Sequence, residues 1–264
     1  MSFPDSARVL YDKNPLTEVI CQLRFPTILR IGTEQPAGFQ EKIRNDYPIY
    51  KLQEPNFEML QPIKEISSIL EQVNFPFPPG SAIHRFGTVD NNKFIALAQD
   101  FIAITEATYE KWGLFRAAIE KAEKALKETY NPAFYTRIGL RYKDIISRQQ
   151  LGITELPWNR LLQPYILGEL GNTDIADNVI RQQTTTLIKI TDIQGGFVKL
   201  NHGLITQGTT KEQCYIIDAD FHAERKEGTN EPFELLDKFN KLAGRLFRWA
   251  ITDDLHGAMH PKSI

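Results

Sequence analysis

The stretch CQLRFPTIL, residues Cys21–Leu29, is echoed in the second half of the chain by IGLRYKDII, residues Ile138–Ile146. Both stretches contain a Leu-Arg-aromatic triplet, at Leu23–Phe25 and at Leu140–Tyr142. In both, apolar residues occupy alternate positions up to the aromatic residue of the triplet, which is the pattern of a half-buried β-strand. The echo suggests that the chain contains two copies of one structural unit.

The rest of the sequence predicts the same order of elements on each side of this echo. Alternating apolar residues indicate strands, and apolar residues three and four apart indicate helices. In the first half we expect a strand at 18–25, a helix at 39–47, strands at 84–89, 93–99 and 101–107, and a helix at 112–130. In the second half we expect a strand at 135–144, a helix at 156–170 interrupted by a proline, strands at 183–192, 196–206 and 213–225, and a helix at 232–251.

This order predicts an α+β fold made of two strand-helix-three strands-helix units, the pseudo-repeats 15–131 and 132–254. We expect one globular domain over 1–264, with a proline-containing connection at about 51–82. Two such units can join their sheets into one long curved antiparallel sheet with helices on one face. The opposite face, the open face, would be left to solvent or a partner. The order resembles the duplicated TATA-binding-protein-like saddle, a fold that hosts unrelated functions.

The composition is that of a globular protein, with 42% hydrophobic and 24% charged residues and a formal net charge of −2. Such a charge creates no global attraction to nucleic acid or to an anionic membrane. No apolar run approaches the roughly 20 residues that cross a bilayer, and the first residues lack a signal-peptide pattern. We therefore expect a cytoplasmic protein with no membrane partner. Cys21 and Cys214, the two cysteines, lie in apolar strand-like runs and are predicted to be buried free thiols.

Three segments carry a resemblance that covers nearly the whole chain. They are NPLTEVICQLRFP at Asn14–Pro26, the IGLRYKDII strand, and LFRWAITDDLHGAMHP at Leu246–Pro261. In these segments the chain resembles a sporadically distributed bacterial protein family of about this length, for which no biochemical activity is established. The resemblance implies a bacterial origin and a horizontally moved gene, and it transfers no catalytic residue. Together with the near-neutral charge, the proline-containing connection and the missing catalytic motifs, it suggests a partner-binding component of an accessory locus, of the defence or toxin–antitoxin type.

Polar and basic residues of the first strand of each half form one candidate binding site. They are Gln22, Arg24, Arg137, Arg141 and Lys143. All alternate with the apolar residues, so they are expected on the open face, where Lys199 would join them. There the cations could grip phosphates or carboxylates of a ligand. In the alternative interpretation they pair across strands with Asp218, Asp220 or Glu106, as opposite charges commonly do in sheets.

The stretch IIDADFHAER contains a candidate metal site. On a strand, Asp218, Asp220 and His222 fall on one face. Carboxylate and imidazole groups at this spacing could hold a divalent metal. The alternative is a strand with a solvated polar face, which shows the same alternation.

The stretch NFPFPPG places Phe75 and Phe77 between prolines. In a loop, these aromatic side chains could dock in a groove of a partner. Alternatively they pack under their own domain.

The sequence contains no glycine-rich phosphate loop, no GxSxG turn and no kinase or dinucleotide signature. No catalytic residue or cofactor is therefore predicted, and a non-enzymatic module that binds a partner protein is the favoured function. The first alternative is a nucleic-acid or nucleotide-binding protein that uses the basic open face. The second is a metal-dependent hydrolase with a dispersed site. Self-association is left open.

Overall fold

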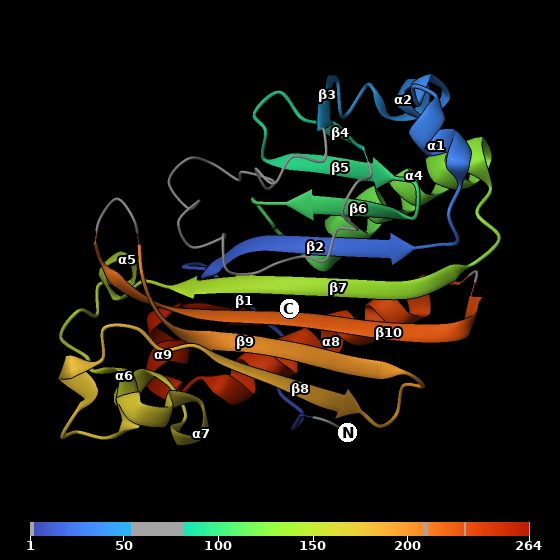
Figure 1. Cartoon of the computed structure of the whole chain (residues 1–264). Coiled ribbons are helices and arrows are strands. Elements are labelled where there is room, and N and C mark those ends of the chain that lie inside the picture. Colours follow the sequence, from blue (N-terminus) through green and yellow to red (C-terminus); the bar gives the residue numbers. More distant parts are fainter. Residues whose placement is uncertain (1–2, 54–81, 208–210, 230, 264) are drawn as a thin grey trace.

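A nine-stranded antiparallel sheet with helices packed on it forms the centre of the protein (Figure 1). The computed structural model describes residues 3–53, 82–207, 211–229 and 231–263, and for 225–229 the backbone only. This arrangement confirms the predicted α+β class. Across the sheet the strands are β3 (Ile49–Gln53), β4 (Ile83–Gly87), β5 (Lys93–Ala98), β6 (Phe101–Glu106), β2 (Leu16–Arg24), β7 (Tyr135–Ile146), β10 (Gln213–Thr229), β9 (Gly196–Thr206) and β8 (Thr184–Ile190).

The two halves of the chain repeat one topology. In the first half the strands lie in the order β4-β5-β6-β2, and in the second half in the order β8-β9-β10-β7. The first strands of the two halves, β2 and β7, pair with each other at the middle of the sheet. Each half closes with a long helix, α4 (Trp112–Tyr130) or α8 (Phe233–Ala250). The echoed triplets therefore lie on two neighbouring strands.

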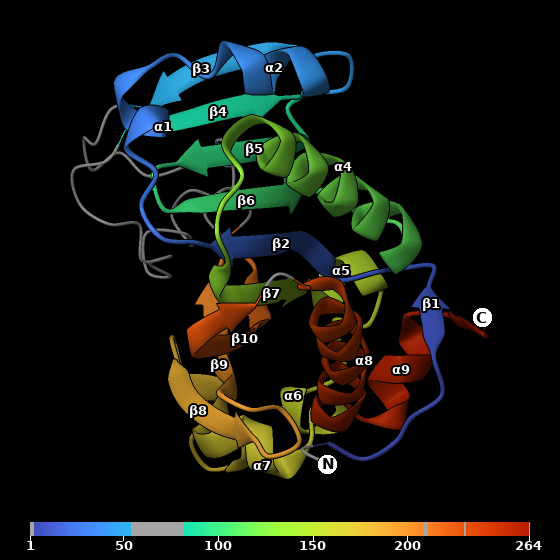
Figure 2. The ribbon, with the colours of Figure 1, turned by 90° about the vertical axis from the view of Figure 1, so that its right-hand side faces the viewer.

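The two long helices cover one face of the sheet (Figure 2). Their apolar stripes meet the side chains of Val19, Cys21 and Leu23, all fully buried on β2. The fully buried helix residues include Phe115, Ile119 and Leu126 of α4 and Leu236, Phe239 and Leu246 of α8. Each such side chain contributes about 1.5 to 3 kcal/mol through its removal from water. This apolar face confirms the alternation seen in the sequence.

Two of the predicted helices differ from what the sequence suggested. The helix predicted over 39–47 ends earlier, as α2 (Ala37–Ile43) after the short α1 (Leu29–Thr33), and β3 follows as an unpredicted edge strand. The segment 156–170 is divided into α6 (Trp158–Leu161), α7 (Pro164–Leu167) and a 3-10 turn, Gly168–Gly171. Pro164 starts α7 rather than continuing α6, because proline has no N–H to donate inside a helix.

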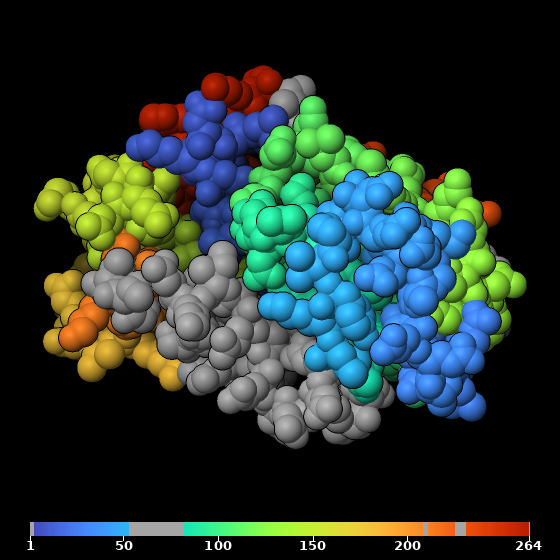
Figure 3. All heavy atoms as spheres, turned by 90° about the horizontal axis from the view of Figure 1, so that it is seen from above, coloured from blue at the N-terminus to red at the C-terminus, as the bar shows by residue number. Residues whose placement is uncertain are grey.

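Several short elements were not predicted at all. The strands β1 (Val9–Tyr11) and β11 (Pro261–Ser263) pair with each other, so N-terminal and C-terminal residues lie side by side (Figure 3). The sequence gives no signal for them because three residues are too few to show alternation. The list is completed by α5 (Arg148–Leu151), the 3-10 turn Ala176–Asn178, and α9 (Asp253–Ala258).

Three further expectations concern single segments. Cys21 and Cys214 are buried free thiols, as predicted. Within the described residues, no helix combines the length and apolar character needed to cross a membrane. Of the predicted connection at 51–82, residues 51–53 belong to β3, and 54–81, which include Phe75 and Phe77, lie outside the described part of the chain.

A tight turn at Gly195 joins β8 to β9. Gly195 has φ 65°, a conformation that glycine adopts without steric cost. A Cβ atom at this position would lie 2.2 Å from the carbonyl oxygen of Glu224 on β10. The backbone of β10 therefore closes over this turn.

We expect Gly195→Ala to lower the free energy of unfolding by about 2 kcal/mol or more, since both the positive φ and the backbone contact oppose a side chain. Gly244→Ala is the matched control, because Gly244 lies inside α8 with open space around it. There alanine should stabilise the protein by about 0.5 to 1 kcal/mol. Urea denaturation followed by circular dichroism measures both changes. Equal stability of the two variants would contradict the tight approach at Gly195.

Candidate functional site

The middle of the open face, the face opposite α4 and α8, carries ordered rows of charged and polar side chains. Each row runs across β2, β7 and β10, and the rows follow from the pairing registers of these strands. The rows are Glu18–Lys143–Asp218, Ile20–Arg141–Asp220, Gln22–Gly139–His222 and Arg24–Arg137–Glu224. The cations of β7 therefore lie directly beside the acidic side chains of β10. We call the side chains of Glu18, Gln22, Arg137, Arg141, Lys143, Asp218, Asp220, His222 and Glu224 the polar network.

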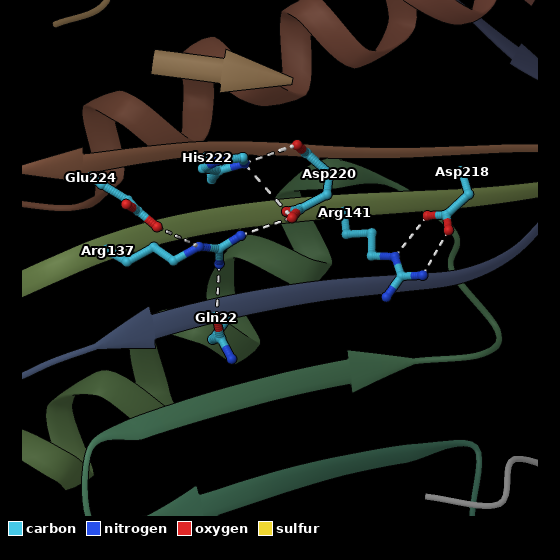
Figure 4. A network of polar contacts seen from close by, with 7 residues as sticks. All are labelled: Gln22, Arg137, Arg141, Asp218, Asp220, His222 and Glu224. Carbon is cyan, nitrogen blue, oxygen red and sulfur yellow. Dashed lines mark hydrogen bonds and ion pairs between the residues drawn. The ribbon is translucent and has the colours of Figure 1, made fainter. Parts of the chain in front are cut away.

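A buried two-pronged ion pair between Arg141 and Asp218 anchors the polar network (Figure 4). Nε of Arg141 donates to Oδ1 of Asp218 at 2.6 Å, and Nη2 donates to Oδ2 at 2.6 Å. The side chains are only 8% and 1% exposed. Burial disfavours the charged form of Arg141, but the charge and hydrogen bonds of Asp218 outweigh it, so the pKa of Arg141 is raised. Arg141 therefore stays charged.

Arg137 links two strands at the other end of the polar network. Its Nη1 donates to Oε1 of Gln22 on β2, and its Nη2 donates to Oδ2 of Asp220 on β10, both at 2.8 Å (Figure 4). Glu224 lies 3.9 Å from Nε. A Cβ atom on Gly139 would lie 2.4 Å from Nη1 of Arg137. Glycine at this position leaves the space in which the guanidinium reaches both partners.

Lys143 is buried between two carboxylates without touching either. It lies opposite Glu18 on one side and Asp218 on the other. Burial lowers the pKa of Lys143, and the two negative charges partly counteract this effect. Burial also raises the pKa of Glu18, with Lys143 and Arg141 acting in the opposite direction. The row Glu18–Lys143–Asp218 thus places one cation between two carboxylates.

Arg24 does not join the polar network. Although its backbone lies opposite Arg137, its Nη2 donates to Oδ2 of Asp100, at 2.7 Å, in the turn between β5 and β6. Its side chain is 30% exposed, against 10% for Arg137. Of the predicted cations on β2 and β7, Arg24 is therefore the most accessible.

The three predicted metal ligands lie on one face of β10, but arginines occupy the carboxylates. Asp218 binds Arg141, and Asp220 binds Arg137. The Nδ1 atom of His222 lies 3.7 Å from Oδ2 of Asp220, and its ring stacks on Phe197. In the part of the chain that the structure describes, no group of three or more His, Cys, Asp or Glu side chains is arranged to hold a metal ion.

The contacts of Arg137 and Arg141 agree with the alternative interpretation, in which the cations pair with carboxylates across strands. Asp218 and Asp220 take arginine partners, whereas Glu106 instead lies 3.3 Å from Lys93. The sequence analysis missed Glu18 and Asp100. The alternation of Glu18 with Gln22 on the same strand could have revealed the first. Asp100 lies in a turn, where no periodic pattern exists to find it.

The open face is exposed at its β8–β9 end. Leu187 of β8 is 62% exposed, and Lys199 lies opposite it on β9. Lys189 and Lys199 are both exposed, and neither forms an ion pair with a described residue. Phe197, which is half-buried, borders them. We call Leu187, Lys189, Phe197 and Lys199 the exposed patch.

The geometry thus separates two parts of the open face. In the polar network Arg137 and Arg141 contact carboxylates, and in the exposed patch two lysines that form no ion pair with a described residue lie beside apolar side chains. No protein-family model matches the chain, and no curated protein matches it.

Removing one partner of the Arg141–Asp218 pair should be far more damaging than replacing both. We expect Asp218→Ala to cost about 3 kcal/mol or more, because Arg141 is then a buried charge without its carboxylate. The double variant Arg141→Met, Asp218→Leu should recover most of this loss. Urea denaturation of the wild type, of Asp218→Ala, of the single variants Arg141→Met and Asp218→Leu, and of the double variant measures the losses and the coupling. Additive losses would show that the pair is not a unit.

Asp144 is a buried carboxyl on β7 whose side chain lies on the helix-facing side of the sheet. It pairs in register with Leu16 and Ile217. Burial raises the pKa of Asp144 to about 8, and the charge of Asp218 adds to the effect. At neutral pH this carboxyl is therefore largely protonated. Between about pH 4 and pH 8 the folded chain holds a proton that the unfolded chain has lost.

Stability should therefore fall as pH rises through this window, since folding then requires proton uptake at Asp144. We expect Asp144→Asn, which keeps the shape without the charge, to gain stability relative to the wild type by at least about 1 kcal/mol between pH 5 and pH 8. Urea denaturation at both pH values measures the difference, in which other titrating groups cancel. A difference that does not change with pH would contradict the raised pKa.

Proposed function

We propose that the protein is a non-enzymatic interaction module that binds a partner protein through the exposed patch of its open face. The observation that carries this proposal is the distribution of free charge. Arg137 and Arg141 are committed to partners inside the chain, while Lys189 and Lys199 are exposed without an ion pair to a described residue. Among the described residues at the β8–β9 end of the open face, these two lysines are thus available to a ligand, next to Leu187 and Phe197.

This patch suits a protein surface better than a nucleic acid. Recognition of phosphates commonly uses arginine forks, and the forks of Arg141 and Arg137 are only 8% and 10% exposed, while Arg24 is paired with Asp100. The net charge of −2 adds no long-range attraction for a polyanion. Apolar and aromatic side chains beside cations are typical of protein interfaces. The partner is expected to present carboxylates around an apolar contact.

The resemblance of the chain to a sporadically distributed bacterial family supports a role as a component of an accessory locus, of the defence or toxin–antitoxin type. In such a role the stable sheet would act as a platform, and specificity would come from the exposed side chains.

Affinity purification from native lysate tests the proposal. We expect the tagged wild type, at moderate salt and after nuclease treatment, to retain a stoichiometric protein partner. Lys199→Glu should reduce the retained partner about tenfold or more, because it places a like charge against an acidic surface. Val89→Lys is the matched control, since Val89 is an 82% exposed apolar residue in a first-half turn. It should retain the partner fully.

Two results would contradict the proposal. One is equal recovery of the partner with Lys199→Glu and with the control variant. The other is the recovery of nucleic acid alone, lost after nuclease treatment, with an affinity that falls steeply with salt. That result would favour a nucleic-acid-binding function instead.

A further inference from the structure

Among the described strands, β8 lies at an outer edge of the sheet, and its sequence allows it to pair with the same strand of a second copy. We propose that two copies of the protein associate by antiparallel pairing of β8 with β8, which would join their sheets into one continuous sheet. The inference rests on backbone geometry and charge at this edge, and it does not depend on the proposed function.

The hydrogen-bonding pattern shows which residues of β8 face outward. The amide of Glu224 on β10 donates to the carbonyl of Gly195, just before β9. Because the register between β9 and β10 is constant, the backbone groups of the odd-numbered residues of β9 form hydrogen bonds with β10. The even-numbered residues of β9 must then bond to β8. Consistently, the amide of Gln182 donates to the carbonyl of Leu204. The even-numbered residues of β8 therefore bond inward.

The odd-numbered residues Thr185, Leu187 and Lys189 turn their N–H and C=O groups toward the free edge. No other strand of the described residues lies beyond β8 in the sheet. The side chains of these same residues are on the open face and are exposed. A partner strand would thus satisfy the backbone groups and cover part of Leu187 at the same time.

This edge lacks the usual devices that prevent strand pairing. Natural edge strands are commonly protected by proline, by several charges, by a bulge or by short length. The strand β8 has 7 residues, TTTLIKI, with no proline, a single charge at Lys189 and an unbroken register to β9. Threonine and isoleucine also have high strand propensity. Both composition and geometry therefore favour the addition of a strand.

The sequence of β8 allows a second copy of this strand to pair with it without placing like charges opposite each other. Leu187 is the central residue of β8, so antiparallel pairing about Leu187 overlaps the two strands completely. In this register Lys189 of each copy lies opposite Thr185 of the other, and no lysine faces a lysine. The two Leu187 side chains become neighbours, which removes part of their 62% exposure. Each outward residue exchanges two backbone hydrogen bonds with the residue opposite.

The two-fold axis of such a dimer is perpendicular to the sheet, so both open faces point the same way. The exposed patches of the two copies then lie side by side. Their four lysines, two from each copy, would form one composite surface.

The mass of the purified full chain between about 1 and 100 µM tests this inference, because that range spans ordinary dimer affinities. Sedimentation equilibrium should show the wild type rising from 30.3 kDa toward twice that mass. Leu187→Pro should remain at 30.3 kDa, since it removes an N–H that the chain itself does not use. Leu187→Lys should weaken the dimer about tenfold or more, because two lysines then face each other.

Val89→Lys is the matched control and should dimerise as the wild type does, and circular dichroism checks that all variants are folded. In the concentrated wild type, the amides of Thr185, Leu187 and Lys189 should also exchange with solvent hydrogen more slowly than in the dilute protein. A wild type that stays monomeric at about 100 µM would overturn the inference. A dimer that survives Leu187→Pro, or that leaves these amides unprotected, would overturn it too.

Discussion

The antiparallel pairing of β2 with β7 positions the remaining side chains of the sheet. Its register sets Val19 opposite Tyr142 and Cys21 opposite Leu140, so the apolar side chains of both strands face α4 and α8. A slip of one residue would turn all of them to the other face. The same register places Gln22 beside Gly139, where the guanidinium of Arg137 passes over the glycine to reach it. One pairing therefore creates both the core and the polar network.

The polar network adds a constraint that apolar alternation cannot supply. If β10 slipped by two residues against β7, the apolar face would still point inward, but Lys143 could face Ile216 instead of Asp218. A buried lysine without a nearby carboxylate is costly. The Arg141–Asp218 pair contributes little net stability compared with an apolar pair of similar size, because both ions lose their hydration. In the observed register Asp218 and Asp220 each meet an arginine of β7.

The centre of the open face and its β8–β9 end differ in exposure. At the centre, Arg137 and Arg141 are buried and paired with Asp220 and Asp218. At the β8–β9 end, Leu187 and Lys199 are exposed, and the backbone of β8 has a free edge. Charged side chains that form no ion pair with a described residue are the ones available to a partner. Arg137 and Arg141, two candidate binding residues of the sequence, are thus paired with carboxylates inside the sheet. The exposed patch lies instead next to the free edge at β8.

The sequence by itself determined the strands β2 and β4 to β10, the two long helices and the repeated order of elements, because their periodicities of two and 3.6 residues are local properties. It also identified Arg137, Arg141, Asp218 and Asp220 as members of one face. Only the tertiary structure decided that Arg141 binds Asp218, that Arg24 turns instead to Asp100, and that β1 meets β11. The choice of a charge partner depends on the register between strands distant in sequence, and register is set by packing of the whole sheet rather than by any local pattern.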